Sequence, residues 1–290
     1  MSVTMQNGRW RAVIAELGAE LSSLVDLATG QEYMWQANPA WWNGTAPVLF
    51  PVIGGLKNGA YSWEGREYKL ASHGFARTSE FSAVSSSADC AEFELASSAK
   101  TREIYPFEFR LRVGFQLERA GIAVRYEVRN TGRSRMYFSI GSHPAFTLPF
   151  AGGSLENYYL LFEREESLER WFFKDGLVVA DKTAEVMDSS RVLTISRTLF
   201  DSGILIFKGP QSHEFSIAHS MSARSIKVVT EGVPYLGVWS KPNGAPFVCI
   251  EPWHGLPDST NASGNLAEKE GIIPLDPSGA FTTGYRVEIT

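Results

Sequence analysis

The sequence predicts an all-β fold, a large antiparallel β-sandwich, and three observations support this. Apolar and polar residues alternate with a period of two in many short segments, as in strands with one buried face. The 3.6-residue period of an amphipathic helix is almost absent. Turn residues follow the strand-like segments along the whole chain, and no linker or low-complexity segment interrupts it. We therefore expect a single domain over residues 1–290.

The clearest alternation lies in the middle of the chain. Residues 107–117 place Phe, Leu or Val at every second position, and residues 122–128 repeat the pattern with Ile, Val and Tyr. A turn at 119–121 joins them, which predicts an antiparallel hairpin with one buried face. Only 163–171 and 198–201 are expected to form brief helices. The other expected strands are 10–14, 20–25, 32–35, 61–63, 68–70, 192–195, 203–207, 214–217, 226–230, 236–239 and 247–251.

The composition and net charge of the chain limit the kinds of molecule it is expected to bind. The chain has 27 Lys and Arg against 32 Asp and Glu, a formal charge of -5, with no block of like charge, so we expect no nucleic-acid partner. No stretch reaches the roughly 18 apolar residues of a membrane span, and the N-terminus lacks the pattern of a signal peptide, which favours a cytoplasmic protein with no membrane contact. Two cysteines, Cys90 and Cys249, do not indicate a disulfide framework.

Three segments carry reactive side chains at expected strand ends. Ser-His-Gly-Phe-Ala-Arg contains His73 and Arg77, Ser-His-Pro-Ala-Phe contains His143, and Ile-Glu-Pro-Trp-His-Gly contains Glu251 and Trp253. A proline directly follows the second histidine and the glutamate, so we expect strand pairing to stop at both places. We predict that the three segments converge on one sugar-sized pocket.

The side chains of these segments suit acid and base chemistry on a carbohydrate. His143 can give or take a proton near neutral pH, and Glu251 would lie on a defined face of the last strand. Arg77 could hold hydroxyls or a phosphate, while Trp239 and Trp253 could stack against a sugar ring. Structural roles stay open for each: a turn histidine, an arginine partner for the glutamate, a surface arginine and core aromatics.

Other mechanisms lack their motifs. The chain has no Gly-x-Ser-x-Gly, no Gly-x-Gly-x-x-Gly after a strand and no phosphate-binding Gly-Lys-Ser/Thr loop. His213, His219 and His254 have no zinc-binding spacing and are expected to be structural or surface residues. We predict no metal site and no cofactor.

Taken together, His-Gly-Phe-Ala-Arg at 73–77, Ser-His-Pro-Ala-Phe at 142–146 and Cys-Ile-Glu-Pro-Trp-x-Gly at 249–255 resemble the aldose 1-epimerase, or galactose mutarotase-like, family. Segments 46–51, 235–242 and 269–272 resemble its bacterial branch in the same order. The resemblance implies a galactose mutarotase-like β-sandwich that interconverts the α and β anomers of a hexose without a cofactor. It also implies that His143 protonates the ring oxygen, that Glu251 accepts the anomeric proton, and that His73 and Arg77 bind the sugar.

The resemblance leaves the substrate open. Galactose mutarotases carry an Asn-Arg pair and a Leu-His-Gly-Gly stretch that this chain lacks, and His-Gly-Phe-Ala-Arg also resembles the hexose-6-phosphate 1-epimerases. Arg77 and Arg102 could then bind a phosphate, and Asp201 could bind a hydroxyl. A non-catalytic carbohydrate-binding domain is the other alternative, because this fold serves both purposes. The expected partner is a small sugar or sugar phosphate, and the chain is expected to be a monomer or a homodimer.

Overall fold

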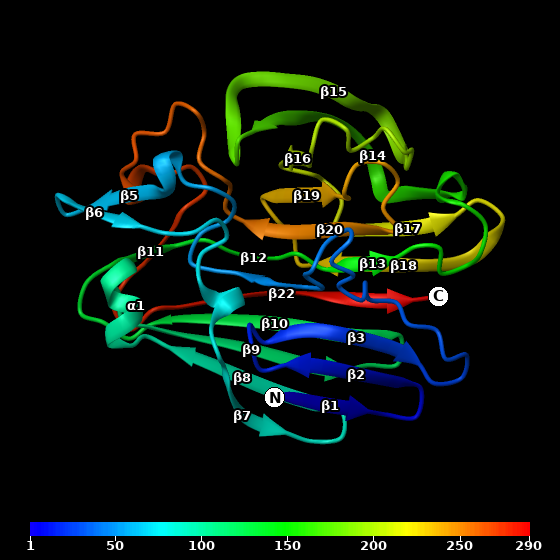
Figure 1. Ribbon diagram of the computed structural model, residues 1–290, viewed down its shortest axis with the longest axis horizontal. Helices are drawn as coiled ribbons and strands as arrows, with labels where there is room; N and C mark the ends of the chain where they lie inside the picture. Colours follow the sequence, from blue (N-terminus) through cyan, green and yellow to red (C-terminus); the bar gives the residue numbers. More distant parts are fainter.

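The protein is built from antiparallel strands, and its two largest sheets pack together as a β-sandwich (Figure 1). The computed structural model describes residues 1–290. The larger sheet has nine strands. In spatial order they are β15 (Leu177–Thr194), β14 (Tyr158–Lys174), β17 (Glu214–His219), β18 (Ser222–Thr230), β22 (Ala280–Ile289), β10 (Gly121–Asn130), β9 (Phe109–Leu117), β8 (Cys90–Ala96) and β7 (Ser82–Ser86).

The smaller sheet of the sandwich has six strands and carries the motifs that contain His143 and Glu251. Strand β20 lies near its middle, pairs with β19 on one side, and pairs with both β12 and β13 on the other. Its strands are β16 (Leu205–Lys208), β19 (Tyr235–Trp239), β20 (Phe247–His254), β12 (Ile140–Ser142), β4 (Val48–Leu49) and β13 (Ala145–Thr147).

Smaller elements complete the molecule. The three-stranded sheet contains β1 (Ser2–Gln6), β2 (Trp10–Ala15) and β3 (Glu20–Asp26); the two-stranded sheets pair β5 (Ala60–Trp63) with β6 (Arg66–Lys69) and β11 (Met136–Phe138) with β21 (Ile273–Leu275). One α-helix, α1 (Ala99–Ile104), and 3₁₀ turns η1 (Lys57–Gly59), η2 (Ala76–Thr78), η3 (Leu155–Asn157) and η4 (Leu266–Glu268) are the only helical segments. None of these has the length and apolar composition that crossing a bilayer requires.

The core lies between the two large sheets and follows from the alternation in the sequence. On β9, Phe109, Leu111 and Val113 are buried, and the polar residues between them are partly exposed. On β20, Val248 and Ile250 join the same cluster of 62 buried hydrophobic residues. Burying each such side chain contributes about 1.5–3 kcal/mol. The sequence prediction of a large antiparallel β-sandwich is confirmed.

The prediction of a helix at 163–171 is wrong, because these residues belong to the longest hairpin, β14–β15. The segment lies within β14, a strand of 17 residues. Its charged residues mostly face solvent, while Glu166 and Leu168 are buried at alternate positions. The Glu166 carboxylate accepts hydrogen bonds from the backbone N–H groups of Gln211 and Ser212 at 3.2 and 2.6 Å. This period of two is that of a strand. Two further predictions are also wrong. Residues 198–201 form a turn where a brief helix was expected, and residues 32–35 make only isolated bridges where a strand was expected.

The expectation that pairing stops at Pro252 is also wrong. Strand β20 continues to His254, and Pro252 lies opposite Leu236 of β19. The N–H of Ile250 donates to the carbonyl of Pro144, so the nitrogen of residue 252, two positions along, points to the same side. There the neighbouring strand is interrupted between β12 and β13. The proline therefore removes no ladder hydrogen bond at this position.

Candidate active site

His143 lies at this interruption between β12 and β13, as its place before a proline predicts. Its backbone N–H donates to the carbonyl of Pro47 at 3.2 Å, which fixes the main chain. The imidazole is buried and stacks on the indole of Trp42, with ring centroids 4.8 Å apart and an interplanar angle of 25°. Trp239 meets the same ring edge-on at 5.6 Å. Backbone and aromatic contacts thus hold the ring in one orientation.

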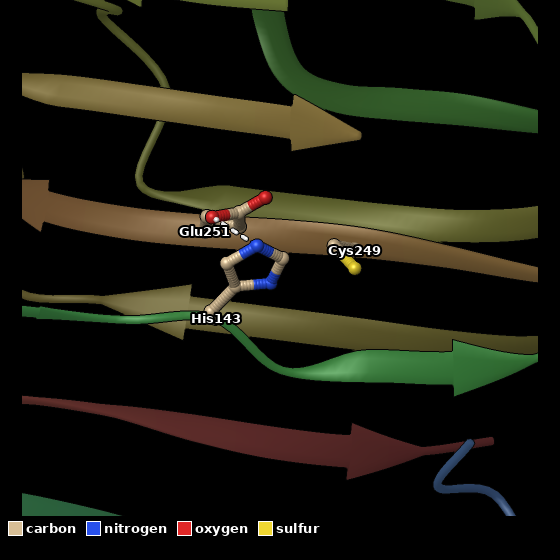
Figure 2. Close-up of side chains that lie close together, drawn as sticks. All are labelled: His143, Cys249 and Glu251. Carbon is tan, nitrogen blue, oxygen red and sulfur yellow. Dashed lines mark ion pairs between the residues drawn. The ribbon is translucent and has the colours of Figure 1, made fainter. Parts of the chain in front are cut away.

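Glu251 reaches His143 from the neighbouring strand. Since Val248 and Ile250 of β20 face the core, the alternation turns Cys249 and Glu251 to the opposite face of the sheet. Glu251 is completely buried, and its Oε2 lies 3.3 Å from His143 Nε2 (Figure 2). Neither carboxylate oxygen has a hydrogen bond of regular geometry, although the indole of Trp253 lies close enough to limit the rise in the pKa of Glu251. The side chain that faces this carboxylate at ion-pair distance is a histidine, not the arginine that a structural role would require.

Burial decides the protonation of this pair. It raises the pKa of Glu251 well above its ordinary value and lowers the pKa of His143 well below its own. Nearby His73 and the Arg77 guanidinium lower the pKa of His143 further. Both shifts favour uncharged groups, because a low-dielectric interior penalises charge. A protonated carboxyl beside a neutral imidazole holds one titratable proton, and a carboxylate beside an imidazolium holds the same number.

His73 is fixed by two hydrogen bonds to one residue. Its backbone N–H donates to the carbonyl of Gly54 at 2.9 Å, and the N–H of Gly54 donates to its Nδ1 at 3.1 Å. These bonds stabilise the left-handed backbone of His73, whose φ is 65°. Burial, with a smaller effect of Arg77, lowers the pKa of His73 to about 4. Its Nδ1 accepts, so the neutral ring carries its proton on Nε2.

Trp253 forms the floor of the site, and two glycines make room for its indole. A Cβ added at Gly141 of β12 or at Gly237 of β19 would approach the Trp253 ring to 2.8 Å. Trp253 is 1% exposed, and its indole lies close enough to Glu251 to lower the pKa of that carboxyl against the larger effect of burial. Trp239, partly exposed, packs against a neighbouring apolar cluster that contains Phe247. Small residues on both flanking strands therefore let one large aromatic ring lie across the sheet.

All six sequence-predicted site residues line one cavity of about 390 Å³, within the usual range for small-molecule sites. Arg77, on η2, is its only lysine or arginine. Arg102, on α1, and Asp201, in a turn, are exposed and do not line it. The lining residues are Trp42, Gly54, His73, Arg77, His143, Phe173, Gly203, Ile204, Trp239, Glu251, Trp253 and Pro257.

Sequence reasoning missed Trp42 and Phe173. Trp42 belongs to the connection between β3 and β4, and no local pattern in the sequence indicates that its ring reaches His143. Phe173 is near the tip of the β14–β15 hairpin, which arches over β16 and β19 in Figure 1. At that tip the N–H of Gly55 donates to the carbonyl of Gly176 at 3.2 Å. Contacts between segments far apart in sequence bring both aromatic residues to the cavity.

Cys249 places a thiol beside His143 and Glu251. One donor atom from each of Cys249, His143 and Glu251 lies within 4.8 Å of the others, and all three residues are buried. In Figure 2 the imidazole lies between two segments of the chain. One is β20, which carries the carboxylate and the thiol, and the other is the segment that follows β12. The sequence prediction that no metal binds is untested by this arrangement. No other grouping of three such side chains occurs.

The sandwich and its outward-facing cavity define a galactose mutarotase-like fold, and comparison with known proteins agrees. A galactose mutarotase related enzyme from Lactobacillus acidophilus superimposes with a TM-score of 0.95 at 32% identity, over 100% of this chain and 97% of that chain. A galactose mutarotase-like protein from Lactobacillus casei gives 0.92 at 30% identity, over 100% of both chains.

Sequence comparison gives the family. A family model for aldose 1-epimerase matches residues 1–273. The chromosomal protein LacX of Lactococcus lactis subsp. lactis is 31% identical over 291 residues, covering 96% of this chain and 97% of that protein. The chain belongs to the aldose 1-epimerase family.

Proposed function

We propose that the protein is an aldose 1-epimerase that interconverts the α and β anomers of a free hexose. The observation that carries this proposal is the contact of His143 with Glu251, 3.3 Å apart on the lining of a cavity large enough for a monosaccharide. A buried carboxyl group without a hydrogen-bond partner costs free energy unless a ligand satisfies it. A hydroxyl of a bound sugar would supply that partner.

The proposed reaction starts from the charged form of the pair, a Glu251 carboxylate beside a His143 imidazolium, which holds the same number of protons as the uncharged form. Glu251 then takes the proton from the anomeric hydroxyl while His143 gives a proton to the ring oxygen. The C1–O5 bond breaks, C1 becomes the aldehyde carbon, and rotation about C1–C2 presents its other face. Ring closure returns both protons. Each positioned acid or base contributes on the order of 10²–10⁴-fold. The raised pKa of Glu251 makes it a stronger base, and the lowered pKa of His143 makes its protonated form a stronger acid.

The other lining groups would bind and orient the sugar. The neutral ring of His73 offers Nε2–H to a sugar oxygen, because its Nδ1 is occupied by the N–H of Gly54. Arg77 offers a planar set of donors that suits paired hydroxyls. Trp239 and Trp253 offer apolar faces for the C–H groups of a pyranose.

Arg77 also favours a second candidate substrate, a hexose 6-phosphate. It is the only lysine or arginine that lines the cavity, and a phosphate would make charge-assisted hydrogen bonds to it. A single guanidinium leaves a dianionic phosphate only partly neutralised, so the free hexose is the preferred substrate in our proposal.

Anomer exchange tests the proposal and distinguishes the substrates. Freshly dissolved α-glucose, α-galactose and their 6-phosphates are followed by polarimetry or by proton NMR, with and without the protein. We expect faster equilibration of a free hexose. Acceleration of the 6-phosphates alone would identify the second candidate. Sugar binding without acceleration of any substrate would instead support a carbohydrate-binding domain and overturn the enzymatic proposal.

A further inference from the structure

Cys249 has no task in the proposed reaction, although its side chain lies beside both reacting groups. It is 0% exposed, it does not line the cavity, and it is held on the same face of β20 as Glu251 by the strand alternation. One donor atom from each of Cys249, Glu251 and His143 lies within 4.8 Å of the others. A thiol, an imidazole and a carboxylate are the ligands that zinc prefers in proteins.

The hydrogen-bond inventory of the three side chains points to a ligand. Both oxygens of Glu251 are buried without a hydrogen bond of regular geometry, and Cys249 is a buried free thiol. A sugar hydroxyl would satisfy the carboxylate but would leave the thiol unused. A cation bound by all three residues would use a donor from each, and would also offset the cost of burying the carboxylate.

The distances fit a tetrahedral ion with one small movement. Zinc holds nitrogen and oxygen ligands at about 2.0–2.2 Å and sulfur at about 2.3 Å, which places ligand atoms roughly 3.3–3.8 Å apart. His143 Nε2 and Glu251 Oε2 already lie 3.3 Å apart. The thiol lies within 4.8 Å of the other two donor atoms, so an approach of up to about 1 Å is needed. Strand pairing fixes the backbone of Cys249 and Glu251, and a hydrogen bond to the carbonyl of Pro47 fixes that of His143.

We infer that His143, Cys249 and Glu251 form a binding site for a thiophilic divalent cation such as Zn²⁺, and that the ion inhibits the enzyme. The ion enters through the cavity, which His143 and Glu251 line. The thiol and the His143–Glu251 pair each release one proton to solvent as the bonds to the metal form. The fourth coordination position faces the cavity and holds water. With the ion bound, His143 has no proton to give and Glu251 cannot accept one.

Ion binding is measured on the whole chain, independently of activity. Zn²⁺ is titrated in competition with a chromophoric chelator, and Co²⁺ serves as a spectroscopic probe, because a thiolate ligand gives an intense near-ultraviolet charge-transfer band. We expect one Zn²⁺ per chain and a cobalt–thiolate band. Cys249→Ser should remove the band and weaken Zn²⁺ binding roughly tenfold or more, since one of three protein ligands is lost. Mg²⁺, which takes oxygen ligands, should not compete.

Cys90→Ser is the matched control. It removes the other thiol, which lies on β8 next to Ser87, and should leave both the band and the affinity unchanged. Circular dichroism checks the fold of each variant, and Cys249→Ala replaces Cys249→Ser if the buried hydroxyl prevents folding. Absence of Zn²⁺ binding to the original chain, or equal binding after loss of Cys249, would overturn the inference.

The inhibitory part of the inference rests on the proposed function, whereas the binding part does not. If anomer exchange is observed, Zn²⁺ should abolish it, a chelator should restore it, and saturating sugar should raise the Zn²⁺ concentration needed. Cys249→Ser should keep the exchange activity and lose most of its Zn²⁺ sensitivity. Zn²⁺ binding without any exchange activity would refute the proposed function and leave the metal site standing.

Discussion

At the scale of single residues, Arg77 separates the two candidate substrates. It is the only lysine or arginine on the cavity lining, so nothing else there can replace its charge. If the substrate is a free hexose, Arg77→Ala removes hydrogen bonds to hydroxyls and should raise KM by roughly tenfold. If it is a 6-phosphate, a charge-assisted pair is lost and KM should rise by roughly a hundredfold.

The comparison of hexose with hexose 6-phosphate also needs a conservative variant of Arg77. Arg77→Lys keeps the charge but loses the planar pair of donors. On a 6-phosphate it should recover much of the lost affinity, because a point charge suffices there. An equal rise of KM for hexose and hexose 6-phosphate in Arg77→Ala would exclude a phosphate role, and no change for either would remove Arg77 from the binding site.

His254 predicts part of the acid sensitivity of the fold. Burial lowers its pKa to about 4, and its Nε2 lies 2.8 Å from Thr283 Oγ1. The unfolded chain binds this proton near pH 6.5 and the folded chain only near pH 4, so stability falls as the pH drops through this window. Between pH 7 and pH 5 the free energy of unfolding should fall by on the order of 2 kcal/mol.

Urea unfolding at pH 7 and pH 5 measures this loss. His254→Gln cannot take up the proton yet keeps polar groups for Thr283. Its unfolding free energy should therefore fall less between the two pH values than that of the original chain. A parallel fall in both proteins would mean that His254 does not sense pH.

At the scale of elements, the β14–β15 hairpin depends on one glycine for its position at the cavity. A Cβ added at Gly55 would lie 2.6 Å from the carbonyl oxygen of Gly176, which accepts the N–H of Gly55 itself. Gly55→Ala should therefore move the hairpin tip outward and take Phe173 away from the cavity. We expect KM to rise roughly three- to tenfold, with about 1 kcal/mol lost from the free energy of unfolding.

Gly114→Ala serves as the comparison for Gly55→Ala. Gly114 lies on β9, and nothing is within 4 Å of an added Cβ. This variant should leave KM unchanged. If Gly55→Ala behaves in the same way in steady-state kinetics, the hairpin tip does not shape the binding site.

The elements also show which parts of the fold the sequence can predict. Strands β9 and β10 follow from alternation alone, because one face of each is buried in the core. The segment 163–171 could not be assigned in this way, since much of it is exposed and its inward face includes a charged residue, Glu166. Pairing through Pro252 depends on the interruption in the neighbouring strand, which no local pattern reveals.

At the scale of the whole molecule, strand β20 belongs both to the hydrophobic core and to the candidate active site. Its Val248 and Ile250 belong to the core shared by both sheets, while Cys249 and Glu251 face the other way. The sequence indicated which groups would meet, because His143, Glu251, His73 and Arg77 occur in recognisable segments. It could not indicate Trp42, Phe173 or the place of Cys249 beside His143, since those positions follow from tertiary packing.

The central claim is that Glu251 and His143 act as base and acid on a bound sugar, and one variant tests it most directly. Glu251→Gln keeps the shape of the side chain and removes its ability to accept a proton. Anomer exchange of the preferred sugar is measured by NMR magnetisation transfer at equilibrium, with sugar affinity measured by calorimetry on the same samples. We predict that the exchange rate falls on the order of 10²–10⁴-fold while affinity changes little. Exchange at the original rate in a folded Glu251→Gln variant would contradict the account.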